Sequence, residues 1–148
     1  MSNNYVTIQN AKLIFRNFAG AENDYNREGK RTFSVILEEQ QANELESQGW
    51  NVRRKEGDDS REALITLPIK VVYTDRSKPT IILITGEKKE ILSEDRISLI
   101  DTSEIIHCDL VIRPYHYNVN GQKGISAYLQ SMAVEIEADY IYLTYLSD

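Results

Sequence analysis

Residues 105–136 read IIHCDLVIRPYHYNVNGQKGISAYLQSMAVEI, and this stretch decides the fold. Two runs rich in β-branched and aromatic residues, from Ile105 to Tyr117 and from Lys123 to Ile136, lie on either side of the dipeptide Asn120-Gly121. Asn-Gly is a strong hairpin signal, because a two-residue type I′ turn needs positive φ at both central positions. The stretch therefore predicts a long β-hairpin that turns at Asn120 and Gly121.

A two-residue turn also fixes the pairing: Tyr117 lies opposite Gly124, Tyr115 opposite Ser126 and Arg113 opposite Tyr128. Side chains alternate between the two faces of a strand, so a slip of one residue would exchange the faces. One face is largely apolar and is predicted to join the core: Ile112, Pro114, His116, Ile125, Ala127 and Leu129. The other face collects Arg113, Tyr115, Tyr117, Ser126, Tyr128 and Gln130.

Three tyrosines and an arginine on a non-core face form a surface on which nucleobases can stack while a guanidinium meets phosphate. The alternative is structural. Tyr is a common strand residue, Tyr117 would cover Gly124 across the strands, and the segment YIYLTYL at residues 140–146 would fold over this face. The hairpin alone leaves both interpretations open.

The rest of the chain also alternates in hydrophobicity over short stretches. Strands are predicted at Ala11 to Arg16, Thr32 to Leu37, Leu67 to Tyr73 and Thr80 to Thr85. In the first strand, alternation puts Arg16 and Phe18 on the face opposite Leu13 and Phe15. Two helices are predicted, one from about Glu38 to Gln48 with Gly49 after its end, and a short one from Ser93, which can cap it, to Asp101.

Mostly strands, one or two short helices and no regular alternation of strand and helix predict a small barrel or curled sheet. The short helix before the last long hairpin is where an oligonucleotide-binding (OB) barrel would place one. We therefore expect an OB-fold-like barrel or curled antiparallel sheet, closed or partly open, with five to seven strands. A β-sandwich is the competing architecture. The length of 148 residues fits a single domain, residues 1–148.

The net charge of −6 would argue against nucleic acid if it were spread evenly along the chain. Two stretches carry it, because residues 38–49 contain four glutamates and no cation, and residues 114–148 contain four acids and one lysine. The remainder is slightly basic, and several of its cations lie close to aromatic residues. The candidate phosphate and base contacts here are Arg16, Phe18, Arg31, Trp50, Arg53 and Arg54, although Trp50 equally fits a core position.

The sequence lacks the motifs that mark several classes of function. No apolar run is long enough to span a membrane, and the start MSNNYVTIQNAK lacks a secretory signal, so we expect a cytoplasmic protein. No Gly-rich phosphate loop, G-x-S-x-G or H-E-x-x-H motif occurs, so we expect no enzyme and no cofactor. We predict no metal site either. Alternation separates Cys108 from its neighbours His107 and Asp109, and the acids Glu94, Asp95 and Asp101 fit helix capping at least as well.

Six blocks of sequence together resemble phage-encoded single-stranded-DNA-binding proteins of OB fold. They are FRNFAG from Phe15, YNREGKRTF from Tyr25, GWNVR from Gly49, LPIKVVY from Leu67, LID from Leu99, and DLVIRPYHYNVNGQKGISAYL from Asp109. The resemblance spans Ala11 to Leu129. It implies a protein of the bacterial host cytoplasm that coats single-stranded DNA during phage replication or recombination, without a cofactor. The implied DNA contacts are Arg16, Phe18, Arg31, Arg113, Tyr115, Tyr117 and Tyr128.

The end of the chain departs from this family. Single-strand-binding proteins commonly end in a flexible acidic tail that recruits other replication proteins, whereas this chain ends EIEADYIYLTYLSD, which alternates and is rich in Tyr. We expect a last strand or a homodimer contact here, since an open Tyr/Leu edge invites pairing.

A rival hypothesis comes from another class of protein. The chain could be a protein-interaction module, for instance a phage inhibitor of a host enzyme that uses its acidic stretches to mimic nucleic acid. That hypothesis predicts that carboxylates, and not cations, line the functional surface.

Overall fold

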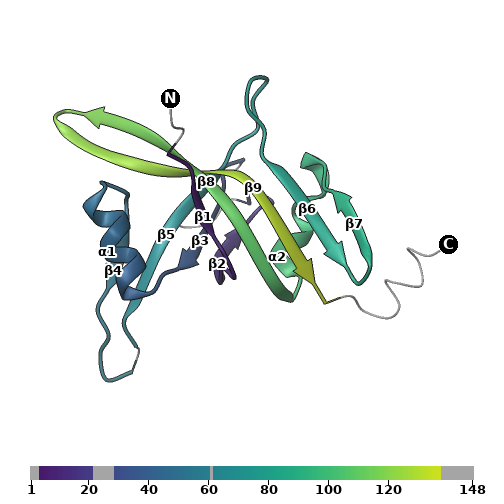
Figure 1. Cartoon of the computed structure of the whole chain (residues 1–148), viewed down its shortest axis with the longest axis horizontal. Helices are drawn as coiled ribbons and strands as arrows, with labels where there is room; N and C mark the ends of the chain where they lie inside the picture. Colours follow the sequence, from purple (N-terminus) through teal and green to yellow (C-terminus); the bar gives the residue numbers. More distant parts are fainter. Residues whose placement is uncertain (1–3, 22–28, 61, 138–148) are drawn as a thin grey trace.

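A computed structural model of the chain describes residues 4–21, 29–60 and 62–137. In this part of the chain nine strands form one sheet with the order β1-β8-β9-β5-β3-β2; β4 pairs with β5, β6 pairs with β9, and β7 pairs with β6 (Figure 1). The strands are β1 (Val6–Ile8), β2 (Leu13–Asn17), β3 (Arg31–Ile36), β4 (Arg53–Lys55), β5 (Leu64–Val71), β6 (Thr80–Thr85), β7 (Lys88–Ile91), β8 (Ile105–Val119) and β9 (Gln122–Ile136). The helical elements are α1 (Glu39–Ser47), the 3₁₀ turn η1 (Glu94–Arg96) and α2 (Leu99–Thr102).

The hairpin β8–β9 is confirmed with the predicted turn, and with the predicted register from the turn to the pair Ile112–Leu129. Beyond this pair Gln130, predicted on the non-core face, is an extra residue of β9 that shifts the register. Asn120 and Gly121 have φ values of 53° and 84°, as a type I′ turn requires. Tyr117 lies opposite Gly124, and Arg113 lies opposite Tyr128. The turn end projects beyond the rest of the sheet, above α1 (Figure 1).

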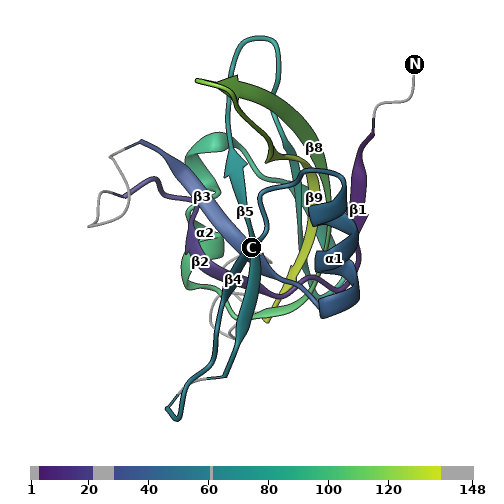
Figure 2. The same cartoon turned by 90° about the vertical axis from the view of Figure 1, so that its left-hand side faces the viewer.

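The sheet curls because β9 belongs to both of its halves. One edge of β9 pairs with β8, and the other edge pairs first with β5, at Ala127, and then with β6, at Ala133. Figure 2 shows the result, with β8 and β9 on one side and β2 and β3 on the other. The fold is a mostly β, OB-like curled sheet, as predicted. The expected count of five to seven strands is too low, because the three- and four-residue strands β1, β4 and β7 carry too little apolar pattern to be recognised.

The core lies on the inner side of this curl. The predicted core face of the hairpin is largely confirmed, since Ile112, Ile125, Ala127 and Leu129 are buried. His116 is exposed, because its part of the hairpin projects past the core.

The first helix is confirmed almost to the residue. Helix α1 buries Ala42 and Leu45 and is followed by Gly49 at φ 101°, a conformation that suits glycine.

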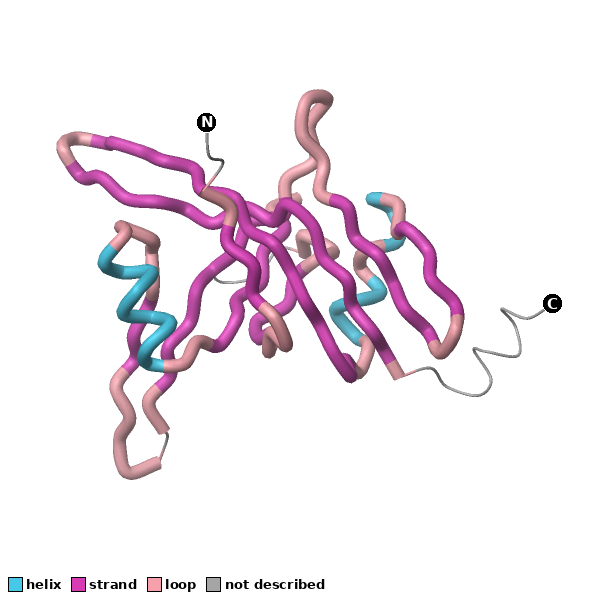
Figure 3. The backbone as a smooth tube through the Cα atoms, viewed as in Figure 1, coloured by secondary structure: helices cyan, strands magenta, loops and turns pink. Residues whose placement is uncertain are grey.

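The second predicted helix is instead two separate turns, η1 and α2, which lie at the opposite end of the molecule from α1 (Figure 3). Ser93 is at the N-cap position of η1, but its hydroxyl makes no capping hydrogen bond and instead donates to the Asp95 carboxylate at 2.5 Å. None of the described helices is long and apolar enough to cross a membrane. The segment YIYLTYL, residues 140–146, lies outside the described residues.

Strand β2 is where the alternation rule fails. Ile14 lies opposite Ser34 and Asn17 opposite Thr32, so β2 holds one residue more than β3 over this interval, which is a β-bulge. Phe15, inside the bulge, has a φ of 54° and is 67% exposed. The prediction that Phe15 shares a face with Leu13, opposite Arg16 and Phe18, is therefore wrong.

Candidate nucleic-acid interface

The tyrosines predicted to lie on the non-core face of the hairpin are found there. Tyr115 and Tyr128 stack on each other with ring centroids 5.2 Å apart and planes 18° apart. Tyr115 is 52% exposed, whereas Tyr128 is more covered. The pair therefore offers one open aromatic surface, which belongs to Tyr115.

Two cations lie beside the Tyr128 ring. The guanidinium carbon of Arg113 is 5.0 Å from the ring centroid, and the ammonium nitrogen of Lys70 is 5.8 Å from it. Both are within the range of cation–π attraction. The sequence reasoning missed Lys70. Its signal was the alternation of LPIKVVY, in which Leu67, Ile69 and Val71 point inward and leave Lys70 on the other face.

The tyrosine pair belongs to a longer surface that we call the outer face. Across the strands, Asn17, Thr32, Lys70, Tyr128 and Arg113 lie opposite one another in register. The outer face comprises Ile14, Asn17, Thr32, Ser34, Ile36, Arg53, Lys55, Leu64, Thr66, Pro68, Lys70, Arg113, Tyr115, Ser126 and Tyr128. None of these described residues is acidic and four are cationic, so this face of an acidic protein is positive.

The two arginines of β4 point to opposite faces of the sheet. Arg53 lies opposite Thr66 and is on the outer face, where it forms no ion pair with the described residues. Arg54 points toward α1, where its guanidinium contacts Glu46 at 2.6 Å and Glu39 at 3.0 Å. The hydrogen bond that the Arg54 guanidinium donates to the Glu46 carboxylate is the main cause that raises the Arg54 pKa. Arg54 is thus engaged by carboxylates, while Arg53 is available.

Tyr117 has a structural contact that the sequence allowed for as an alternative. Its hydroxyl donates to Oδ1 of Asn51 at 3.1 Å, and its ring lies so close over Gly124 that a Cβ there would collide with it. Tyr117 therefore covers a glycine that has no side chain to pack.

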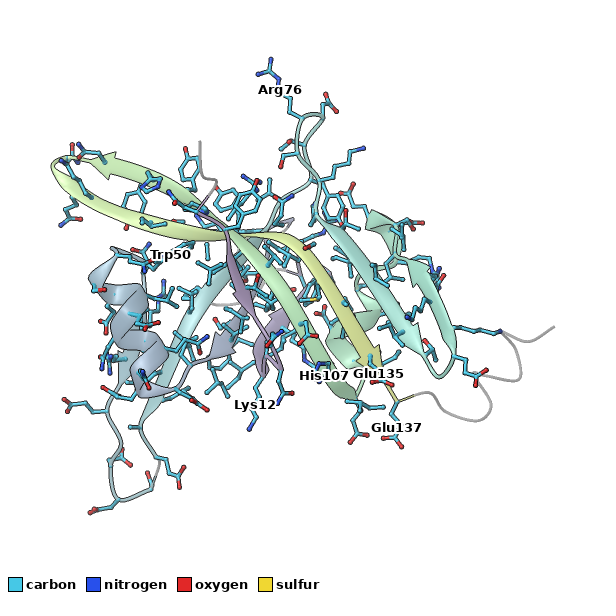
Figure 4. The ribbon with its side chains drawn as sticks, viewed as in Figure 1. Lys12, Trp50, Arg76, His107, Glu135 and Glu137 are labelled. Atoms are coloured by element: carbon cyan, nitrogen blue, oxygen red, sulfur yellow. The ribbon has the colours of Figure 1, made fainter. Side chains whose placement is uncertain are left out.

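Two predicted base-stacking residues belong to the core instead. The Phe18 ring is fully buried and stacks on Phe33 at 4.9 Å. Trp50 is 5% exposed and bridges to Ile125, between α1 and the projecting hairpin (Figure 4). A base cannot stack on either ring in this structure. The prediction failed for Phe18 because the β2 bulge shifts the alternation, and for Trp50 because the chain after α1 turns back under the hairpin.

Arg16 and Arg31 are also apart from the outer face. Arg16 donates from Nη1 to the carbonyl oxygens of Ile100 and Ser103, at 2.7 Å and 2.6 Å. Arg31 forms an ion pair with Glu94 at 2.7 Å, and its guanidinium lies 5.4 Å from the Tyr73 ring centroid. Both side chains tie the sheet to η1 and α2.

Asp109, Cys108 and Asp101, which the sequence raises as possible metal ligands, have structural roles. Asp109 accepts hydrogen bonds from the backbone of Asn10 and from His107, which lower its pKa. Burial raises the pKa of the Cys108 thiol to about 12. Asp101 accepts from the backbone N–H groups of Phe18 and Ala19. The described residues include no group of three or more His, Cys, Asp or Glu side chains able to hold a metal ion.

Comparison with known families gives this surface its context. The family model described as "Putative phage ssDNA-binding domain" matches residues 2–147. The chain belongs to this family of phage single-stranded-DNA-binding domains. The resemblance noted in the sequence is therefore confirmed, and single-stranded DNA is the ligand of the family.

Solved structures with a similar fold also come from a phage. The single-stranded DNA-binding protein of bacteriophage Enc34 in complex with ssDNA has 10% identity and a TM-score of 0.57, and covers 91% of this chain and 88% of that one. A C-terminal truncation of the Enc34 protein has 11% identity and a TM-score of 0.56, and covers 91% of this chain and 87% of that one. At such identities the likeness concerns the fold. No curated protein sequence matches the chain.

Proposed function

We propose that this protein binds single-stranded DNA on the outer face of its sheet and protects it during phage DNA replication or recombination. The observation that carries the proposal is the stacked pair Tyr115–Tyr128, with Arg113 and Lys70 beside the Tyr128 ring, on an outer face whose described residues include no acid. A single strand offers bases that stack and phosphates that attract cations, and this surface presents a partner for each.

We assign base stacking on this surface to Tyr115. Tyr128 is packed by Tyr115 and has Arg113 and Lys70 beside its ring, so we assign it the role of holding these three side chains in place. A base on Tyr115 extends a stack that Tyr128 begins, and stacking of one base on an aromatic ring contributes about 1 to 3 kcal/mol.

Phosphate binding is assigned to the outer-face cations Arg53, Lys55, Lys70 and Arg113. Single-strand binding through such contacts weakens as salt rises, because bound counterions are released. A positive face on a protein of net charge −6 also directs the DNA to one side of the molecule.

The remaining expectations complete the proposal. The protein acts by binding alone, as one domain without a cofactor, in the cytoplasm of the bacterial host where phage DNA is copied. Pairing of two copies through residues 140–146, and contacts with replication or recombination proteins, stay predictions. The rival hypothesis of acidic mimicry has less support, because Arg54 already engages Glu39 and Glu46 in the most acidic stretch.

The neighbouring arginines of β4 provide a matched test. Binding of a fluorescent oligo(dT) of about 15 nucleotides is measured by anisotropy at several salt concentrations, a length near the upper end of known single-fold site sizes. Arg53→Ala should flatten the slope of log K against log salt by about 0.7, the contribution of one phosphate contact. Arg54→Ala should leave the slope unchanged, because its guanidinium faces α1.

Circular dichroism first establishes that both variants are folded. A slope that changes for Arg54→Ala and not for Arg53→Ala would move the binding surface to the side of α1. Absence of binding to any single strand by the unaltered protein would remove the proposal.

A further inference from the structure

Phe15 is exposed and strained. Its side chain is 67% exposed, and its φ of 54° is a left-handed conformation that bulky L residues adopt at a cost in free energy. Such outliers persist where the surrounding structure enforces them, and they cluster at functional sites. A phenylalanine that gains neither burial nor relaxed geometry needs another explanation.

The surroundings of Phe15 hold it in this position. Arg16 is tied to the carbonyls of Ile100 and Ser103, and Phe18 is buried with its backbone N–H bonded to Asp101. Ile14, on the other side, is in register with Ser34. The bulge is therefore anchored at both ends, and it presents the ring to solvent from a fixed backbone.

The position of Phe15 relates it to the outer face. The paired residues on either side of the bulge, Ile14 and Asn17, both belong to that face, and β2 ends the sheet order β8-β9-β5-β3-β2. Tyr115 lies on β8, and four strand spacings along the sheet separate β8 from β2, which is about 19 Å at roughly 4.8 Å per spacing. This distance corresponds to about six stacked nucleotides at roughly 3.4 Å each. One strand of DNA can therefore reach from Tyr115 to Phe15 within a single site of about 4 to 16 nucleotides.

We propose that Phe15 is a second base-stacking residue, which takes another base of the same DNA strand at the β2 end of the outer face. The DNA then crosses the strands of the sheet, from β8 and β9 over β5 and β3 to β2. Between the two aromatic positions it passes Lys70, Thr32 and Asn17, whose polar groups suit a sugar-phosphate backbone. This inference rests on the proposed function and adds to it a second contact and a path.

The test compares strands with and without bases. Phe15→Asn removes the ring but keeps a residue that tolerates left-handed φ. Affinity for a 15-nucleotide oligo(dT) should fall about 5- to 140-fold, the range that corresponds to the stacking of one base. On a strand of the same length made of abasic sugar-phosphate units, Phe15→Asn and the unaltered protein should bind equally, because stacking needs a base. Ile91→Asn is the matched control, since Ile91 is 71% exposed on β7, away from the outer face.

Each outcome of these binding measurements supports or overturns the role of Phe15 in base stacking. If Phe15→Asn binds oligo(dT) like the unaltered protein while Tyr115→Ala binds more weakly, the inference is overturned and the proposed function stands. Equal weakening on the abasic strand also overturns it, because the ring would then not act by stacking. If the unaltered protein binds no single strand, the proposed function itself fails.

A measurement on the unaltered protein covers the case in which Phe15→Asn does not fold. Oligo(dT) carrying the photoreactive base 5-iodouracil is cross-linked to the protein, and the modified residues are found by mass spectrometry. Modification of Phe15 together with Tyr115 supports the inference. Modification at Tyr115 with none at Phe15 overturns it.

Discussion

The hairpin β8–β9 and strand β2 are both amphipathic, yet simple alternation holds only in the turn half of the hairpin, as far as the pair Ile112–Leu129. In the hairpin the Asn120-Gly121 turn fixes the register, and Tyr115 and Tyr128 lie on the outer face as predicted. In β2 one extra residue turns Phe15 outward and Phe18 into the core. The difference shows that a turn with a strong sequence signal sets the register as far as the first bulge, which in the hairpin lies between Val111 and Ile112. An internal bulge, as in β2, resets the register without a comparable signal.

The largest expected effect concerns the hairpin and base stacking. Tyr115→Ala should weaken oligo(dT) binding by about 1 to 3 kcal/mol, because one stacked base is lost, while the salt slope stays unchanged. The double variant Tyr115→Ala with Tyr128→Ala should lose little more, since Tyr128 supports Tyr115 and does not take a base of its own. Anisotropy titrations at two salt concentrations measure both.

Tyr128→Phe serves as the control, because it keeps the ring that Tyr115 packs against. Unchanged affinity in a folded Tyr115→Ala variant would show that bases stack elsewhere. A loss for the double variant that is twice the loss for Tyr115→Ala would show that both rings take bases.

A smaller effect is expected at the hairpin turn. Gly121 has a φ of 84°, so Gly121→Ala forces an L side chain into a left-handed conformation. This should lower the free energy of unfolding by about 1 to 2 kcal/mol, measured by urea denaturation. Nothing within 4 Å would meet the new Cβ, so the cost comes from the backbone alone. A variant as stable as the unaltered protein would mean that the turn does not hold the register.

In β2 the reverse kind of substitution, from a bulky residue to glycine at a left-handed φ, should have the smallest effect. It should not lower the free energy of unfolding, in contrast to Gly121→Ala. Phe15→Gly relieves the left-handed φ but adds freedom to the unfolded chain, and it removes little burial. We expect the free energy of unfolding to stay unchanged or to rise by up to about 1 kcal/mol. A loss of 2 kcal/mol or more would indicate that the Phe15 ring packs in the fold, and the contrast between the two regions would disappear.

Much of the fold follows from patterns that are local in the sequence. The Asn-Gly turn, the apolar stripe of α1 with Gly49 after it, and the burial of Cys108 in β8 could all be predicted, since each depends on residues close together in the chain. The short strands β1, β4 and β7 could not, because three or four residues at a sheet edge hold too little pattern. These short strands form because the longer strands β8, β5 and β6 supply their backbone hydrogen-bond partners.

The candidate site was predictable to a similar extent. Arg113, Tyr115 and Tyr128 follow from the turn, whereas the contribution of Lys70 depends on parallel pairing of β5 with β9, which no local pattern reveals. Arg53 and Arg54 look alike in sequence, and only the position of α1 decides that one meets carboxylates and the other solvent.

The central claim is that single-stranded DNA lies on the outer face of the sheet, and NMR of ring-labelled tyrosines tests it most directly. Tyr115 and Tyr128 are on the outer face, while Tyr73 lies beside Arg31 and Glu94 on the other side of the sheet and has its pKa raised by burial. Addition of oligo(dT) should shift the ring signals of Tyr115 and Tyr128 through the ring currents of stacked bases and leave those of Tyr73 in place. Shifts at Tyr73 with unchanged signals at Tyr115 would contradict the account.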